Sequence, residues 1–133
     1  PYTTLFRSNL ASCVHFNKSA HLFLGYYLYM ESSAPARPGN QAILESQPWL
    51  SAPKGGQCMK FFYTMYGKTM GSLIVKLQEF GKRAKNVFTK TGDQGLHWIG
   101  AKVSLNIPEG TKYKVIQSKD MSKEDTTRMW QFF

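Results

Sequence analysis

Apolar and polar residues alternate with a period of two along several short segments, which is the pattern of half-buried β-strands. The most regular segment covers residues 58–66, where Met59, Phe61, Tyr63 and Met65 occupy alternate positions. Side chains at alternate positions of a strand point to the same face of a sheet. We therefore expect this strand to turn an apolar face toward a core, with Phe61 and Tyr63 as its anchors.

A second alternation follows directly, in which Leu73, Val75 and Leu77 alternate with the polar residues Ser72, Lys76 and Gln78. The two alternating segments are joined by residues 67–71, which hold two glycines. A short glycine-containing connection between two alternating segments predicts an antiparallel hairpin. We expect Leu73 and Val75 to be core residues.

Further strand-like segments are separated by turns rich in glycine, proline, asparagine and aspartate, and no segment of the central region has a helical period. These strands are expected over residues 26–30, 41–46, 85–90, 98–105 and 113–116. In the strand that begins at Trp98, Ala101, Val103 and Leu105 should face inward, and Trp98 and Val103 are expected in the core. The fold class is therefore all-β, with two sheets packed as a β-sandwich or jelly roll.

The two ends of the chain do not share this alternation of apolar and polar residues. Residues 1–8 read Pro-Tyr-Thr-Thr-Leu-Phe-Arg-Ser, which resembles the translation of a common sequencing-library adapter. We therefore do not expect these residues to form part of the fold. Residues 9–24 show no period and are left unassigned. Residues 117–133 read as a polar and charged tail, in which Ser122 and Asp125 are placed to cap a short helix.

Composition and charge narrow the possible partners. The chain has 133 residues, 42% of them hydrophobic, and a formal net charge of +9. Its basic residues are spread along the sequence, and several alternate with apolar ones, which is typical of a solvated sheet face. We therefore expect no nucleic-acid partner, and no direct membrane insertion because no apolar run approaches about 20 residues.

No constellation of residues predicts catalysis. The three histidines, two cysteines and scattered carboxylates match no nucleophilic, acid/base or metal-binding spacing, so no catalytic, cofactor-binding or metal site is expected. Cys58 is interpreted as half of a disulfide, although its basic neighbour Lys60 would also suit a reactive thiol. The aromatic residues Tyr26, Tyr27, Tyr29 and Trp49 are candidates for an interface.

The order of these blocks resembles that of the MAM domain, the module named after meprin, A5 and receptor tyrosine phosphatase mu. The resemblance lies in Gly-Tyr-Tyr-Leu-Tyr-Met-Glu-Ser-Ser at 25–33, Pro-Gly-Asn-Gln-Ala at 38–42, Cys-Met-Lys-Phe-Phe-Tyr-Thr-Met-Tyr-Gly at 58–67, Met-Gly-Ser-Leu at 70–73, Gly-Asp-Gln-Gly at 92–95, residues 98–103 and Tyr-Lys-Val-Ile at 113–116. It implies an extracellular, non-catalytic jelly-roll module of secreted or membrane-anchored proteins. Such a module serves in adhesion, and its partner is another protein or a second copy. A carbohydrate-binding jelly roll and an accessory domain of a secreted protease are the alternatives.

The chain departs from the family at both ends. A MAM domain opens with a cysteine pair and an acidic, aromatic segment, and residues 9–24 match neither. It closes with a strand rich in glycine and aspartate and a cysteine that pairs with the equivalent of Cys58, and residues 117–133 lack both. The resemblance therefore predicts a jelly roll over residues 25–116 that is an incomplete fragment at both ends, with the disulfide partner of Cys58 absent.

Overall fold

A computed structural model describes residues 39–46, 49–67, 70–120 and 130–132. Residues 1–8, residues 9–24 and the expected helix cap at Ser122 lie outside these ranges. The same holds for three of the candidate interface aromatics, Tyr26, Tyr27 and Tyr29. Among the described residues, no helix is long and apolar enough to cross a membrane.

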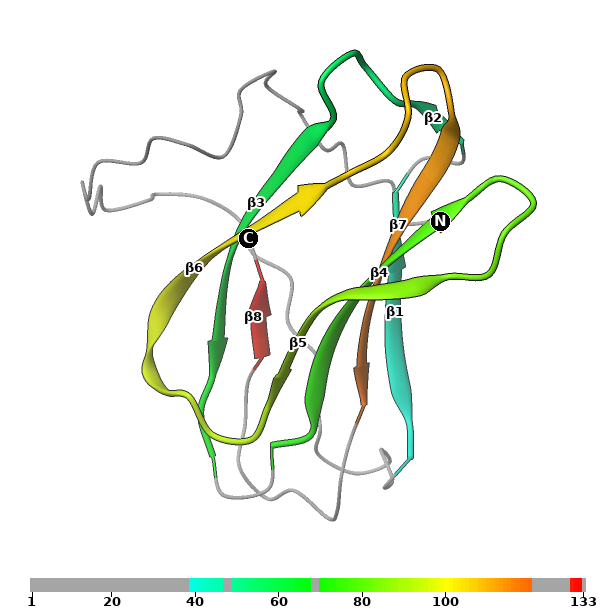
Figure 1. The fold of residues 1–133 in the computed structure, drawn as a ribbon. Helices are drawn as coiled ribbons and strands as arrows, with labels where there is room; N and C mark the ends of the chain where they lie inside the picture. Colours follow the sequence, from blue (N-terminus) through cyan, green and yellow to red (C-terminus); the bar gives the residue numbers. More distant parts are fainter. Residues whose placement is uncertain (1–38, 47–48, 68–69, 121–129, 133) are drawn as a thin grey trace.

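The described residues form two antiparallel sheets that lie face to face (Figure 1). The five-stranded sheet has the order β1-β7-β4-β5, with β2 also paired to β7. Its strands are β1 (Gln41–Glu45), β2 (Leu50–Ser51), β4 (Ser72–Glu79), β5 (Lys85–Thr91) and β7 (Lys112–Asp120). The three-stranded sheet has the order β6-β3-β8, with β3 (Gln57–Met65), β6 (Gly95–Leu105) and β8 (Trp130–Phe132). The predicted sandwich is therefore observed.

The core fills the space between the sheets, and it is built from the alternate positions that the sequence indicates. Five of the six residues predicted for the core are buried: Phe61 at 3% exposure, Tyr63 at 2%, Leu73 at 5%, Val75 at 0% and Val103 at 6%. Phe88 of β5 joins the two sheets, because its ring lies 5.2 Å from the ring of Phe61 and 5.8 Å from that of Tyr63. Both contacts are edge-on, an arrangement that aromatic rings favour.

The core assignment of Trp98 is wrong, since this side chain is 44% exposed. In β6 the odd-numbered residues Ala101, Val103 and Leu105 are buried, whereas the even-numbered residues between them are exposed. Trp98 shares the parity of the exposed set and therefore lies on the outer face. Its size and apolar character suggested burial, but the alternation of the strand decides its side.

The predicted hairpin between residues 58–66 and 73–78 is also wrong. β3 belongs to the three-stranded sheet and β4 to the five-stranded sheet, so the connection at residues 67–71 crosses from one layer to the other. β4 pairs with β5 instead, through a turn in which the amide of Lys82 donates to the carbonyl of Glu79 at 3.0 Å. Alternation shows which face of a strand is buried, but it does not show which strand lies alongside.

The last long strand continues past the residue where its apolar alternation stops. β7 runs to Asp120, and a short strand, β8, pairs with β3 further along the chain. The inward positions of β7 change from Tyr113 and Val115 to Gln117 and Lys119, all of them buried. Polar residues at inward positions explain why residues 117–120 read as the start of a polar tail.

Gly71 allows the connection between β3 and β4 to approach the end of β7 closely. A Cβ atom at this position would collide with the carbonyl oxygen of Asp120, and backbone atoms cannot move aside cheaply. The next residue, Ser72, donates its amide to the Asp120 carboxylate at 2.5 Å. Close backbone approach therefore requires glycine here.

Candidate interaction surface

The outer face of the five-stranded sheet carries a row of apolar side chains. Register places Ile43 of β1 opposite Ser118 of β7, and Ser118 opposite Ile74 of β4. Ile43 is 60% exposed and Ile74 is partly exposed. In the next row, Ile116 lies between Glu45 and Lys76. This face is therefore mixed in polarity, and it is less polar than a fully solvated sheet face.

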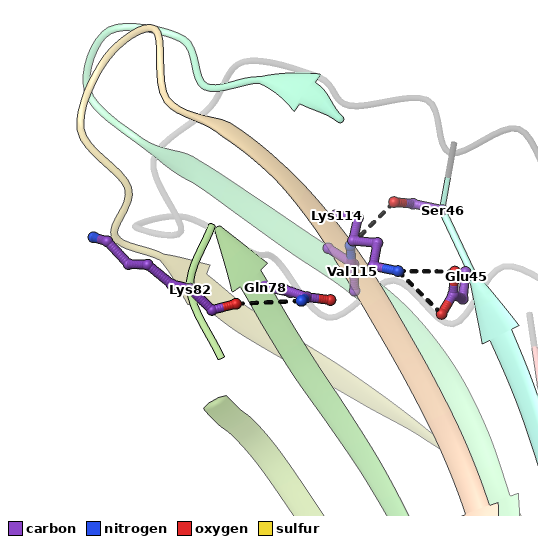
Figure 2. Close-up of polar contacts among 6 residues, drawn as sticks. All are labelled: Glu45, Ser46, Gln78, Lys82, Lys114 and Val115. Carbon is purple, nitrogen blue, oxygen red and sulfur yellow. Dashed lines mark hydrogen bonds and ion pairs between the residues drawn. The ribbon is translucent and has the colours of Figure 1, made fainter. Parts of the chain in front are cut away.

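Ser46 directly follows β1 and is hydrogen-bonded to β7 at the edge of this sheet. Its amide donates to the carbonyl of Val115 at 2.9 Å, and its hydroxyl accepts from the amide of Val115 at 3.0 Å (Figure 2). A side-chain oxygen thus replaces a strand carbonyl in the ladder, and Ser46 itself is buried. The chain leaves the ladder here and rejoins it at Leu50, opposite Tyr113.

Trp49 stands at this re-entry point. It has a φ of 59°, and among the described residues it is the one non-glycine residue with a positive φ. Its ring meets that of Phe80 edge-on, with centroids 4.9 Å apart, and the Lys114 ammonium lies 5.7 Å from the Trp49 ring centre. Phe80, at the end of β4, is 65% exposed. Two aromatic rings and a cation therefore meet where β2, β4 and β7 end or begin.

Ion pairs involve Lys114 and the β4–β5 turn that follows Phe80. The Lys114 ammonium lies 3.1 Å from a Glu45 carboxylate oxygen on the neighbouring strand (Figure 2). Glu79 pairs with Lys82 at 2.6 Å and with Lys85 at 3.6 Å, both in or next to the β4–β5 turn. The hydrogen bond from Lys82, followed by the charges of both lysines, outweighs desolvation and lowers the pKa of Glu79.

The Gln78 amide completes this network on the outer face. It donates to the carbonyl of Lys82 at 3.2 Å, and register places Gln78 opposite Lys114 (Figure 2). The turn is thereby tied to the strand that precedes it. This turn, which carries Lys82 and Arg83, directly follows Phe80 in the chain.

A crevice of about 170 Å³ opens between the two sheets, near β2. Its described lining is mainly apolar and includes Leu50, Met59, Leu105 and Val115. Of the described lining residues, Lys60 and Tyr113 are titratable, and burial raises the pKa of the Tyr113 phenol. The described lining residues include no carboxylate, so they form no carboxylate acid/base pair.

Cys58 is disulfide-bonded in the structure. The expectation that its partner is absent from the chain therefore does not hold in this structure. The sequence contains one other cysteine, Cys13, which lies outside the described residues. A disulfide at Cys58, the second residue of β3, leaves no free thiol that could act as a nucleophile.

Of the four predicted interface aromatics, the structure describes Trp49 alone and places it in this surface cluster. Sequence reasoning missed its neighbours Phe80, Lys114 and Glu45. The sequence did contain a signal for an exposed Phe80, because this aromatic residue follows a regular alternation and immediately precedes a turn that begins with Gly81. Lys114 and Glu45 had none, because the pairing of β2 with β7 brings Lys114 to Trp49 and the pairing of β1 with β7 brings Glu45 to Lys114.

Comparison with known proteins gives the family. The sequence profile of the MAM domain, meprin/A5/mu, matches residues 6–129. The chain belongs to the MAM domain family. MAM domains are jelly rolls, so the match agrees with the two-sheet architecture described above. The matched residues extend beyond residues 25–116, on which the resemblance in the sequence was based.

Relatives of this MAM domain are long proteins. MAM domain-containing glycosylphosphatidylinositol anchor protein 1 of Rattus norvegicus is 38% identical over 88 residues, which are 65% of this chain and 9% of that protein. Thyroid hormone-induced protein B of Xenopus laevis is 38% identical over 82 residues, 60% of this chain and 12% of that protein. MAM domain-containing protein 2 of Mus musculus is 38% identical over 84 residues, 62% of this chain and 12% of that protein. The chain thus spans about a tenth of the length of these relatives.

Proposed function

We propose that this MAM domain is an extracellular recognition module of a secreted or membrane-anchored protein, and that it binds a protein partner or a second copy of itself. Family membership is the observation that carries this proposal. The names of several relatives point the same way, since they describe proteins with a glycosylphosphatidylinositol anchor. Such an anchor attaches a protein to a membrane surface.

The outer face of the five-stranded sheet supplies a suitable contact surface. Its apolar side chains Ile43, Ile74 and Ile116 lie on neighbouring strands, with Glu45 and Lys76 beside them. Protein interfaces combine a partly apolar centre with a polar rim. The exposed side chain of Ile43 is the natural anchor of such a contact, because burying it removes apolar surface from water.

The proposed module acts by surface complementarity and without chemistry of its own. The Glu45 carboxylate on this surface is engaged by Lys114, and Glu79, which is buried at an inward position of β4, is engaged by Lys82. The pKa of Glu79 is lowered, which favours a permanently charged carboxylate at neutral pH. A general acid or base requires a pKa near the working pH, so this shift supports a structural role.

The test presents the purified chain to a panel of cell-surface ectodomains and to itself, with binding measured by biolayer interferometry. We expect at least one protein ligand, and a loss of binding for Ile43→Asp, because a charge on this face opposes burial. Leu96→Asp is the matched control, since Leu96 is 77% exposed on the other sheet.

Absence of any protein ligand across the panel would contradict the proposed function. Equal loss for Ile43→Asp and Leu96→Asp would contradict the assignment of the surface. Circular dichroism of each variant verifies that the fold is unchanged.

A further inference from the structure

We propose that the end of the five-stranded sheet near the β4–β5 turn binds an acidic glycan, that is, a sulfated or carboxylated polysaccharide. The site is an aromatic–basic rim that combines two contacting aromatic rings with a local excess of positive charge. It consists of Trp49, Phe80, Lys82, Arg83, Lys85 and Lys114.

Charge is the first argument for this site. The rim carries four cations, and the two carboxylates that it engages are Glu45 and Glu79. Arg83 lies in the exposed turn between Lys82 and Lys85. The Lys82 and Lys85 side chains remain 67% and 56% exposed while they contact Glu79, so both can also contact a ligand. Clustered positive charge of this kind attracts a polyanion and is screened by salt.

The aromatic pair is the second and independent argument. Phe80 leaves most of its ring in water although an apolar core lies between the sheets. Trp49 is held in a left-handed backbone conformation, which costs free energy in a residue other than glycine. Strain of this kind persists where the surrounding structure enforces it, and here it sets the indole against Phe80 and beneath Lys114.

The combination of features selects a glycan over other anions. A sugar ring offers an apolar face that can lie against an exposed aromatic ring, and its sulfate or carboxylate groups accept hydrogen bonds from lysine and arginine. The Gln78 amide beside the rim has an oxygen available for a sugar hydroxyl, since its nitrogen donates to the Lys82 carbonyl. A ligand that offers only charged groups has no apolar face to lie against the two aromatic rings.

This proposal does not rest on the recognition of a protein partner. The rim lies at the end of the sheet, around Trp49 and the β4–β5 turn, whereas the proposed protein contact centres on Ile43 in β1. Loss of glycan binding would leave the protein contact intact, and loss of the protein contact would leave the glycan site intact. Each of the two proposals can therefore be contradicted by its own experiment without contradicting the other.

The charge argument is tested with heparin as the probe and the full chain on a biosensor surface. Arg83→Gln should weaken binding by about tenfold, since hydrogen bonds to charged groups are among the stronger ones. Lys90→Gln removes the same charge from the opposite end of β5, where the nearby ring of Phe88 packs against the buried rings of Phe61 and Tyr63, and should weaken binding by less than about twofold. Equal losses for both variants would show general attraction to a basic protein and would overturn the site.

The aromatic argument is tested with an uncharged pair of variants. Phe80→Ala should weaken heparin binding by roughly three- to tenfold, which corresponds to the loss of one favourable ring contact. Leu96→Ala removes an exposed apolar side chain from the other sheet and should have no effect. Unchanged binding for Phe80→Ala would overturn the glycan assignment, because charge alone would then explain the affinity.

The class of ligand is tested with chemically desulfated heparin, a DNA duplex and phosphatidylserine vesicles. We expect desulfated heparin to bind at least about tenfold more weakly than heparin, since most of its anionic groups are gone. DNA and vesicles should bind more weakly than heparin and without dependence on Phe80. If either of them binds as tightly as heparin, and loses this binding in Phe80→Ala, the proposed ligand class is wrong.

Discussion

β3 and β7 cross the sandwich in opposite layers, and their inward faces differ in kind. β3 turns four apolar side chains inward, namely Met59, Phe61, Tyr63 and Met65. β7 begins in the same way with Tyr113 and Val115 but continues with Gln117 and Lys119, which are also buried. Both strands are nine residues long, yet only β3 has a continuous apolar face.

The difference shows two ways of keeping a strand in a sheet. β3 is stabilised by burial of apolar surface and by the disulfide at Cys58. The polar half of β7 depends on backbone pairing with β1 and β4, on both sides. At its end, the Asp120 carboxylate accepts from the amide of Ser72. Hydrogen bonds therefore hold β7 where apolar burial does not.

The largest expected effect comes from emptying the core position on β3. Phe61→Ala should lower the free energy of unfolding by about 3–5 kcal/mol, because a buried ring is lost and a cavity remains. Phe80→Ala is the matched control on the surface and should change stability by no more than about 0.5 kcal/mol. Both values are obtained from urea denaturation followed by fluorescence. Similar values for the two variants would contradict the distinction between core and rim.

The covalent anchor of β3 should have the next largest effect. Cys58→Ser should destabilise the chain by about 2–5 kcal/mol, since a disulfide constrains the unfolded state. Peptide mapping without reduction should find Cys58 in a cross-linked peptide. A wild-type chain that melts at the same temperature with and without a reductant would show that β3 does not need this bond.

A substitution on β7 should have the opposite sign. Within the described structure, neither polar atom of the Gln117 side chain has a hydrogen-bond partner, although the residue is only 4% exposed. Gln117→Leu should therefore stabilise the chain by about 1–3 kcal/mol, the usual cost of an unsatisfied buried polar group. Gln78→Leu is the control, because its amide is bonded and partly exposed. A destabilised Gln117→Leu variant would indicate that the amide is satisfied in solution.

The smallest expected effect is the dependence of stability on pH. Burial raises the pKa of the phenols of Tyr63 in β3 and Tyr113 in β7 above the ordinary 10.0. A raised folded-state pKa gives stability that is present below pH 10 and is lost as the pH rises through the folded-state values. Absorbance at tyrosinate wavelengths should show these two phenols ionising together with alkaline unfolding.

At the acid end, the lowered pKa of Glu79 gives the opposite dependence. Its contribution is present above the ordinary value of 4.5 and is lost as the pH falls through the lower folded-state value. Glu79→Gln should flatten the acid limb of a plot of melting temperature against pH. An unchanged acid limb would show that the lysine contacts of Glu79 add nothing to stability.

The sequence by itself determined the fold class, the most regular strands and most of the core. Alternation predicted the inward side chains of β3 and β4, including Phe61, Tyr63, Leu73 and Val75, because a strand with one apolar face has one way to bury it. The blocks that resemble the MAM domain identified the family that the profile match shows. These features are local along the chain, so they are visible without coordinates.

Only the tertiary structure decided which strands are neighbours and which side chains meet at the surface. The connection after β3 changes sheets instead of forming a hairpin, and Trp98 follows the parity of its strand to the outside. Residues 117–120 remain in the sheet although their inward positions are polar, because β1 and β4 satisfy their backbone groups from both sides. Trp49, Phe80 and Lys114 come together for the same reason: strand pairing joins residues that are far apart in the sequence, and no local pattern encodes it.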